Sequence, residues 1–338
     1  MKRIFTLLFA VLTATTIMAQ MHGPMKFVGA SNMTVSTMSN DNPSDTILFA
    51  MNGMESGNIT LPAMKGMQTI PSFTISGAKF TLGENNVVTF ADQTFSAKVT
   101  VDGEEKNITG SSLSGTYNMA DNSLMLTVVF QYGNMPMSMT YTVKGYYVKA
   151  VSNPIAVTVG GQFTYNNDNV TYELRRYKDG KTDKLDVTVP SYTLANTVMG
   201  DLTLGSYTVK GLVYDEAQGG YYRDYKNDGL MFHFTAVKNG KTTMDKDYEF
   251  AADEANNILV KYEGSNVSSI VNTFQVGTMP FGIVSVFSGA TTSINDITTT
   301  PSHDFNTTSS QQYNLAGQRV DNNYKGIVIV NGKKYLRK

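Results

Sequence analysis

The sequence predicts an all-β protein of two tandem antiparallel β-barrels followed by a short C-terminal β tail. The first observation behind this prediction is a duplication, because residues 58–77 recur in altered form as residues 186–211. Pro62 and Pro190 stand 128 residues apart, whereas the glycines that end the two segments stand 134 apart. A repeat of this period indicates a duplicated domain, and the second copy carries six additional residues.

The second and third observations are alternation and turn signals. Apolar and polar residues alternate along residues 95–101, 124–130 and 139–143. Such alternation places one face of each strand on a core and the other in water. No segment after the first 20 residues shows helical periodicity over three turns. Turn dipeptides typical of β-hairpins occur at Asp102-Gly103, Asp179-Gly180 and Asn239-Gly240.

The length of 338 residues allows two domains, each with a core of its own. We expect the boundary between them at the polar stretch Val151-Ser-Asn-Pro154. Closing each sheet into a barrel would remove the exposed edges that invite aggregation. The expected organisation is a signal peptide at 1–19, a first barrel at 20–150, a second barrel at 151–290, a Ser/Thr-rich linker at 291–312 and a β tail at 313–338.

The N-terminus predicts export. Lys2-Arg3 precedes an apolar run from Ile4 to Met18, and Ala19 provides a small residue for cleavage. This run is short for a membrane anchor. The chain contains no cysteine, which excludes a lipoprotein anchor and disulfides. We therefore expect the mature protein in the periplasm, on the outer-membrane surface or outside the cell, stabilised by core burial alone and without a transmembrane segment.

The charge balance excludes nucleic acid as a partner. There are 27 Lys and Arg residues against 28 Asp and Glu, giving a formal net charge of -1. Such a chain has neither a basic footprint for DNA or RNA nor a polybasic membrane patch.

The repeat carries a family resemblance. Its second copy runs through Val189-Pro190, then Met199-Gly-Asp-Leu-Thr-Leu204, then Tyr207-Thr-Val209. This pattern resembles the calycin-like β-barrel domain of exported Bacteroidota proteins, over about residues 25–150 and 151–290. The first copy departs from the pattern at Gln68-Thr-Ile-Pro71. The resemblance implies two tandem antiparallel calycin/lipocalin-like β-barrels, and it implies no catalytic residues.

The tail has a resemblance of its own. Residues 313–320 and 325–334 predict two or three short strands with a turn at Asn331-Gly332. They resemble the last strands of the C-terminal sorting domain used by the type IX secretion system. The segment is shorter than such a domain, so sorting and a small packed β unit remain alternatives.

Catalytic groups are scarce, and we expect no enzyme and no cofactor. The three histidines, His22, His233 and His303, do not form one cluster in the sequence. There is no thiol nucleophile, no Gly-x-Ser-x-Gly elbow and no Gly-rich phosphate loop. The acidic pair Glu104-Glu105 lies beside a predicted hairpin turn and Asp253-Glu254 in a polar connection. Neighbouring carboxylates in such exposed segments are usually solvated.

Metal sites are also not expected, although three patterns in the sequence contain residues that could bind a metal ion. Met135, Met137 and Met139 share a strand face, which could hold copper or equally fill a core. Cleavage after Ala19 would leave Gln20-Met-His22, which suits square-planar Cu(II). Two loops rich in Asn and Asp could hold calcium but are typical of turns, residues 40–42 and 166–169.

These observations favour a binding function. Small barrels can enclose one apolar ligand, and we expect this role for the protein. The alternative is a surface adhesion or structural module whose outer face binds a glycan or a protein. Tyr221, Tyr222 and Tyr225 are the weak candidates for ligand contact, and they could equally be half-buried structural residues.

Overall fold

The computed structural model describes residues 23–65, 69–83, 86–251, 254–277 and 279–289, together with the backbone of three tail strands. The described residues contain no helix, which confirms the all-β class. They fall into two compact units, residues 1–289 and 290–338. The expected signal peptide at 1–19 and residues 291–311 of the expected linker lie outside the described residues.

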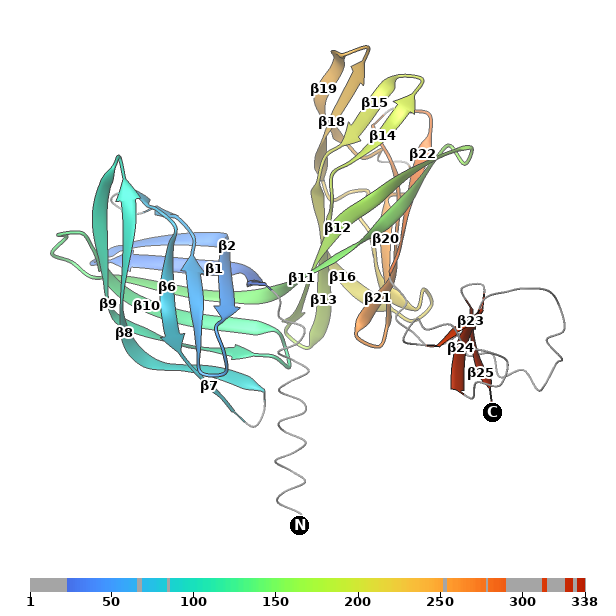
Figure 1. Cartoon of the computed structure of the whole chain (residues 1–338). Helices are drawn as coiled ribbons and strands as arrows, with labels where there is room; N and C mark the ends of the chain where they lie inside the picture. Colours follow the sequence, from blue (N-terminus) through green and yellow to red (C-terminus); the bar gives the residue numbers. More distant parts are fainter. Residues whose placement is uncertain are drawn as a thin grey trace. The chain divides into compact units, whose positions relative to one another are not determined.

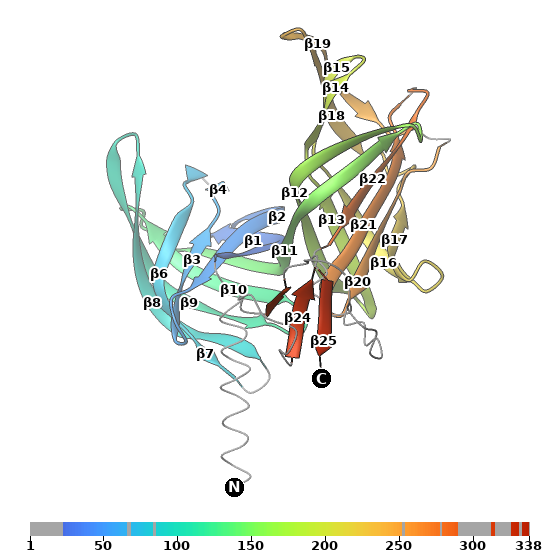
Figure 2. The same cartoon turned by 45° about the vertical axis from the view of Figure 1, so that its right-hand side comes forward.

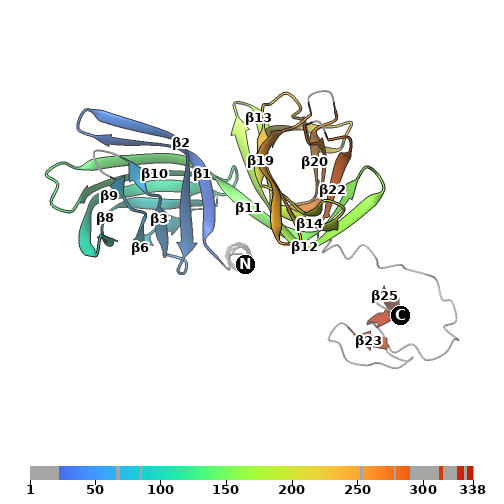
Figure 3. The same cartoon turned by 90° about the horizontal axis from the view of Figure 1, so that it is seen from above.

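Eight antiparallel strands of residues 139–288 form a closed barrel, which we call the C-terminal barrel. Each strand pairs with the next, and β12 pairs with β11 to close the ring (Figure 3). Most inward residues of these strands are buried and apolar, with the buried polar residues Asn272 and Ser285 among them. In ring order the strands are β11 (Met139–Val159), β12 (Phe163–Asp179), β13 (Thr182–Val189), β16 (Tyr207–Asp215), β17 (Gly220–Asp224), β20 (Asn257–Glu263), β21 (Asn266–Gln275) and β22 (Gly282–Ser288).

In the N-terminal half the same sheet continues from β11 and curves around a core of its own (Figure 1). Two backbone ladders run outward from β11, one ending at β6 and the other at β8 and β7. The Gln93 side-chain amide joins β6 to β8, accepting from Lys79 N and donating to Lys79 O, both at 2.8 Å. The strands are β1 (Met25–Val35), β2 (Met38–Met51), β3 (Ser56–Leu61), β6 (Phe73–Lys79), β7 (Thr81–Leu82), β8 (Val87–Val101), β9 (Glu104–Asn118) and β10 (Ser123–Tyr132).

Strand β11 belongs to both halves. Its residues 139–148 pair with β1, and its residues 155–159 pair with β22. The polar stretch 151–154, where we expected a domain boundary, continues as strand and pairs with β12. An ion pair also connects the two halves, because Lys26 Nζ on β1 lies 2.8 Å from Glu173 Oε2 on β12. Independent folding of residues 20–150 and 151–290 remains a prediction.

The two repeated segments make three equivalent hydrogen bonds each. A serine after the turn donates to the carbonyl that ends the preceding strand, Ser72 to Leu61 O and Ser206 to Val189 O, each at 2.7 Å. The second is a bond between threonine hydroxyls on the paired strands, Thr60–Thr74 at 2.8 Å and Thr188–Thr208 at 2.9 Å. In the third, a glycine N–H donates to a side-chain oxygen, Gly77 to Asn58 Oδ1 at 3.1 Å and Gly211 to Asp186 Oδ1 at 2.8 Å.

The two copies differ in the hairpin between these strands. In the N-terminal half it consists of β4 (Met64–Lys65) and β5 (Thr69–Ile70). In the C-terminal barrel it consists of β14 (Tyr192–Thr197) and β15 (Gly200–Leu204), so the six additional residues lengthen it. Strand β15 of the longer hairpin pairs with β18 (Met231–Lys238), and β18 pairs in turn with β19 (Lys241–Glu249). The resulting four-stranded sheet extends from one end of the barrel (Figures 1 and 2).

Aromatic rings fill much of both interiors. In the N-terminal half, the ring centroids of Phe49, Phe80 and Phe90 lie 5.3–5.8 Å apart in edge-to-face geometry. In the C-terminal barrel, the Phe250 ring lies 4.9 Å from Phe232 and 5.0 Å from Tyr207. Such pairs add stability beyond the area they bury.

The predicted hairpin turns are confirmed. Asp102 and Gly103 have φ of 51° and 83°, and Asn239 and Gly240 have φ of 54° and 72°. Two successive positive φ values characterise the tight turns that match strand twist. At the third turn only Gly180 has positive φ, at 61°.

The tail unit contains three short strands. These are β23 (Gln312–Asn314), β24 (Gly326–Val330) and β25 (Lys333–Arg337), and they form one antiparallel sheet in that order. The strands agree with the sequence expectation, whereas the predicted turn at Asn331-Gly332 lies outside the described residues. A role in sorting remains a prediction.

Candidate functional site

An apolar pocket lies where the four-stranded sheet meets the end of the C-terminal barrel. We call it the barrel-mouth pocket, and its volume is about 580 Å³. That volume lies within the range of about 300–1,000 Å³ typical of small-molecule sites. Its lining residues are Val159, Gly160, Gln162, Phe163, Tyr165, Leu194, Thr197, Val198, Met199, Leu202, Leu204, Phe234, Met244, Tyr248, Met279, Pro280, Phe281 and Ile283.

Large apolar side chains on the pocket rim are exposed to water. Val198 is 88% exposed, Phe163 59% and Phe281 56%. These residues come from three different connections, namely the β14–β15 turn, the start of β12 and the segment before β22. Exposed apolar side chains gathered around a concave site mark binding sites for apolar partners.

The lengthened hairpin builds one wall of the pocket. β14 and β15 contribute Leu194, Leu202 and Leu204, and the turn between them contributes Val198 and Met199. In the N-terminal half the short hairpin instead places Met64 and Ile70 in the core. The six-residue difference between the copies therefore coincides with the site.

The pocket lining is almost entirely apolar. No charged side chain lines it among the described residues. The same ranges contain no group of three or more His, Cys, Asp or Glu side chains that could hold a metal ion. The lining offers apolar contact and a few hydroxyl or amide groups, which suits an uncharged apolar molecule.

The three tyrosines singled out from the sequence lie elsewhere. Tyr221 is buried and packs edge-on against Tyr214 and Tyr262, at 5.7 and 6.0 Å. Tyr225 is buried in the barrel interior, and Tyr222 is half-buried. Tyr221 and Tyr225 are therefore buried, which agrees with the structural role that the sequence also allowed for them.

Sequence reasoning missed the barrel-mouth pocket. A signal was present, because Val198-Met199 occupies a hairpin turn and Met279-Pro-Phe281 a connection, where polar residues are usual. Alternation identifies the inward residues of a strand, but it does not show whether they leave a cavity.

Two of the three candidate metal patterns lie in the described residues, where their side chains have other contacts. Met139 is buried, and Met135 and Met137 pack against the N-terminal core. Residues 40–42 and 166–169, which the sequence predicted as loops, lie instead within strands β2 and β12, because ladder pairing with β1 and β11 extends over these polar stretches. Asn42 Nδ2 donates to Asp45 Oδ1 and Asn40 Nδ2 to Lys65 O, each at 2.5 Å. Residues 20–22 lie outside the described residues.

His233 lies on the outer face of β18, opposite to the buried Phe232 and Phe234, as its position between them predicted. Its Nδ1 is 2.8 Å from Asp247 Oδ1, and its Nε2 is 3.0 Å from Asp245 Oδ1. The hydrogen bond to Asp247, with the negative charge of Asp245, raises the pKa of His233 above its usual value.

We expect an NMR titration to place the pKa of His233 above that of an unstructured histidine. Asp247→Asn should lower it more than Asp245→Asn, because the Asp247 hydrogen bond is the largest cause of the shift. Since the folded pKa is the higher one, its stabilising contribution is complete below the unfolded pKa and disappears as pH rises through the folded pKa. An unchanged pKa in both variants would contradict this assignment.

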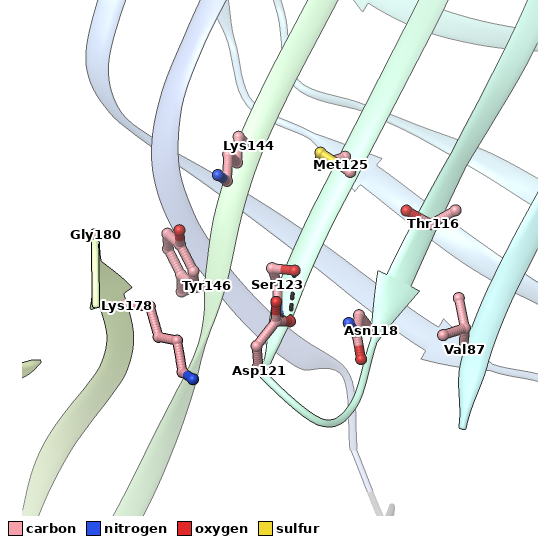
Figure 4. A pocket seen from close by; sticks show the side chains of 10 residues that line it. All are labelled: Val87, Thr116, Asn118, Asp121, Ser123, Met125, Lys144, Tyr146, Lys178 and Gly180. Carbon is pink, nitrogen blue, oxygen red and sulfur yellow. Dashed lines mark hydrogen bonds between the residues drawn. The ribbon is translucent and has the colours of Figure 1, made fainter. Parts of the chain in front are cut away.

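A second pocket, of about 420 Å³, lies on the outer face of the sheet (Figure 4). It is polar, with Lys144, Tyr146 and Asp121 on the N-terminal half and Lys178 on the β12–β13 hairpin. Asp121 Oδ1 accepts from Ser123 Oγ at 2.6 Å. Its mixture of charges and a half-buried tyrosine is suited to a polar partner.

Comparison with known proteins gives one match to a family model and one to a solved structure. Within the described ranges no helix has the length and apolarity needed to cross a membrane. No curated protein matches the chain. A solved structure of a “putative outer membrane protein” from Bacteroides fragilis matches with 15% identity, covering 80% of this chain and 98% of that one, at a TM-score of 0.25. Residues 26–146 match the family model of the calycin-like beta-barrel domain, so the N-terminal half is similar to that family.

Proposed function

We propose that the protein is an exported, non-enzymatic binding protein that holds an apolar small molecule in the barrel-mouth pocket. The observation that supports this most is the pocket itself, with its volume of about 580 Å³, its uncharged lining and its exposed apolar rim. The calycin-like domain in the N-terminal half is compatible with binding. Burial of an apolar ligand in such a pocket removes apolar surface from water.

The proposal includes a duplicated architecture and a cell-envelope location. The shared hydrogen bonds of the two repeated segments support descent of both halves from one calycin-like barrel. The leader with Lys2-Arg3 and the apolar run supports export. Sorting by the tail through type IX secretion belongs to the same proposal and rests on residues 313–338.

The alternative is a surface module that binds a glycan or protein through its outer face. One observation favours it, namely the polar pocket with Tyr146 among charged and amide side chains. An aromatic ring beside polar groups is suited to a sugar.

Filling the barrel-mouth pocket should weaken apolar binding at least tenfold, which corresponds to about 1.4 kcal/mol. We choose Leu202→Trp, because Leu202 is half-buried in the pocket wall and the larger ring would occupy the cavity. The protein has no tryptophan, so the new side chain also reports on its own environment by fluorescence. Binding is measured by titration with a fluorescent apolar probe and by native mass spectrometry of protein purified from its source.

The matched control is Val213→Trp, which places the same ring on an exposed position of β16 that lines neither pocket. It should bind the probe like the unaltered protein. Equal binding by both variants, with no co-purifying apolar compound, would contradict the proposed site and favour the surface module.

A further inference from the structure

The two ends of the C-terminal barrel differ in the residues of their connections. At the end opposite to the barrel-mouth pocket, each hairpin turn follows a strand that ends in an acidic residue. These residues are Asp179 of β12, Asp215 of β16 and Glu263 of β20. Asp215 Oδ1 accepts from Ala217 N and Gln218 N at 2.8 and 3.1 Å. Polar turns of this kind are typical of a surface that faces water.

The mouth end has a different composition. It consists of the β11–β12 turn, the turns of the two hairpins in the four-stranded sheet and the segment before β22. These are residues 159–163, 197–200, 238–241 and 279–283. None of these residues is acidic, and Lys238 and Lys241 are the charged ones. Asp201, the next acidic residue after the β14–β15 turn, accepts from Asn196 N at 2.7 Å within its own hairpin.

Apolar side chains protrude around the opening at this end. Among the large apolar residues that line the barrel-mouth pocket, Phe163, Val198, Met199 and Phe281 are exposed, over 41% to 88% of their surface. We call these four the mouth patch. A single exposed apolar side chain is common on proteins, whereas several around one concave site mark a binding surface.

Positive charge lies next to the mouth patch. Lys238 Nζ donates to Val198 O at 3.0 Å, which holds the tip of one hairpin against the other. Lys241 pairs with Lys238 across the tight turn between β18 and β19, and both lysines are exposed. A lysine beside apolar side chains can keep its ammonium group among phosphates or water while its methylene groups contact apolar surface.

A lipid surface matches the mouth patch better than a protein does. The core of a protein interface is packed as densely as a protein interior. The mouth patch surrounds an open pocket of about 580 Å³ and comes from three separate connections, so a rigid partner would leave this space unfilled. Lipid chains have no fixed shape and can follow such a rim. Proteins that bind at a membrane interface combine buried apolar side chains with Lys or Arg near the head groups.

We propose that the protein docks on an anionic lipid surface through its barrel mouth, with the mouth patch inserted among the lipids and Lys238 and Lys241 beside the phosphates. Apolar insertion supplies most of the affinity, because two lysines are fewer than a polybasic segment contains. The link to ligand uptake rests on the proposed function, since an apolar molecule would then pass between the lipid and the pocket without crossing water.

The test measures co-sedimentation of the exported protein, freed of its leader, with vesicles of phosphatidylcholine, alone or mixed with phosphatidylglycerol. Val198→Asp should weaken binding to both kinds of vesicle at least tenfold, because a charged side chain replaces an apolar one that is buried on docking. The matched control is Val213→Asp, the same change at an exposed position of the barrel wall. It should bind like the unaltered protein, and urea unfolding checks that both variants fold.

Lys241→Gln separates the charge from the apolar contact. Loss of one lysine at an anionic surface should weaken binding about fivefold on the mixed vesicles and leave binding to pure phosphatidylcholine unchanged. Insertion is measured with Val198→Trp, which introduces the only tryptophan of the chain. Vesicles with brominated acyl chains should quench its fluorescence and should not quench that of Val213→Trp.

The inference is overturned if Val198→Asp and Val213→Asp bind vesicles alike, or if brominated lipid quenches neither tryptophan. Self-association in place of vesicle binding, abolished by Val198→Asp, would also overturn it and assign the mouth patch to a second copy of the chain. Leu202→Trp separates this result from the proposed function, because Leu202 lines the pocket but is not part of the mouth patch. This variant should sediment with vesicles like the unaltered protein, and normal probe binding by it would contradict the apolar site alone.

Discussion

Replacing Asp186 by alanine is expected to lower the free energy of unfolding by about 3–5 kcal/mol, the range for breaking one partner of a buried ion pair. The Asp186 side chain is only 4% exposed, and Arg175 Nε and Nη2 both donate to its Oδ2, at 3.1 and 2.5 Å. Its Oδ1 accepts from Gly211 N at 2.8 Å. Arg175 also donates to Val28 O at 3.1 Å, so the loss would reach the N-terminal half.

The duplication supplies the control for this measurement. Asn58 occupies the equivalent place in the first copy and accepts from Gly77 N, but its surroundings are more exposed. Asn58 Oδ1 also accepts from Asn52 Nδ2 at 2.8 Å. Asn58→Ala should therefore cost about 1–2 kcal/mol, the usual net value of two exposed hydrogen bonds. Asp186→Asn, which keeps the acceptor for Gly211 and loses the ion pair, should fall between the two. The readout is the urea midpoint at constant slope, and equal midpoints for both alanine variants would contradict the ranking.

Much of the fold was predictable from the sequence because strands and hairpin turns are indicated by residues that are close together in the chain. Alternation and the Asp-Gly and Asn-Gly turns identified strands and hairpins from neighbouring residues alone. The repeat predicted a shared arrangement that the hydrogen bonds of Ser72 and Ser206 confirm. The pairing partners were less accessible, since they depend on contacts distant in sequence. The run of β11 through residues 151–154 shows this, because a polar stretch with a proline resembled a boundary.

The candidate site depends on the part that sequence patterns do not determine. The repeat shows that the second copy has six extra residues. It does not show that the lengthened hairpin pairs with β18 and forms one wall of a pocket. Burial of Tyr221 and Tyr225 similarly follows from which strands lie beside β17. The longer hairpin of the second segment forms one wall of the barrel-mouth pocket, whereas the short hairpin of the first segment places Met64 and Ile70 in the core.

The pairing of β1 with β11 leaves no room for a side chain at Gly29, so we expect a substitution there to be strongly destabilising. Gly29 of β1 lies opposite Gly145 of β11. A Cβ at Gly29 would lie 2.0 Å from Lys144 O and 2.5 Å from Gly145 Cα, and neither backbone atom can move without separating the strands. Gly29→Ala should therefore destabilise the protein by about 3 kcal/mol, the upper end for overpacking.

The control lies on the facing strand of the same pair. A Cβ at Gly145 would meet its nearest neighbours, Phe27 Cβ and Val28 C, at 3.4 Å, which is ordinary contact. Gly145→Ala should shift the unfolding free energy by less than about 1 kcal/mol, within the spread of ordinary substitutions. Urea unfolding followed by tyrosine fluorescence compares the two, because the chain contains 19 tyrosines and no tryptophan. Equal midpoints would show that β1 and β11 can separate at little cost, and would argue against close backbone approach as the reason for glycine at position 29.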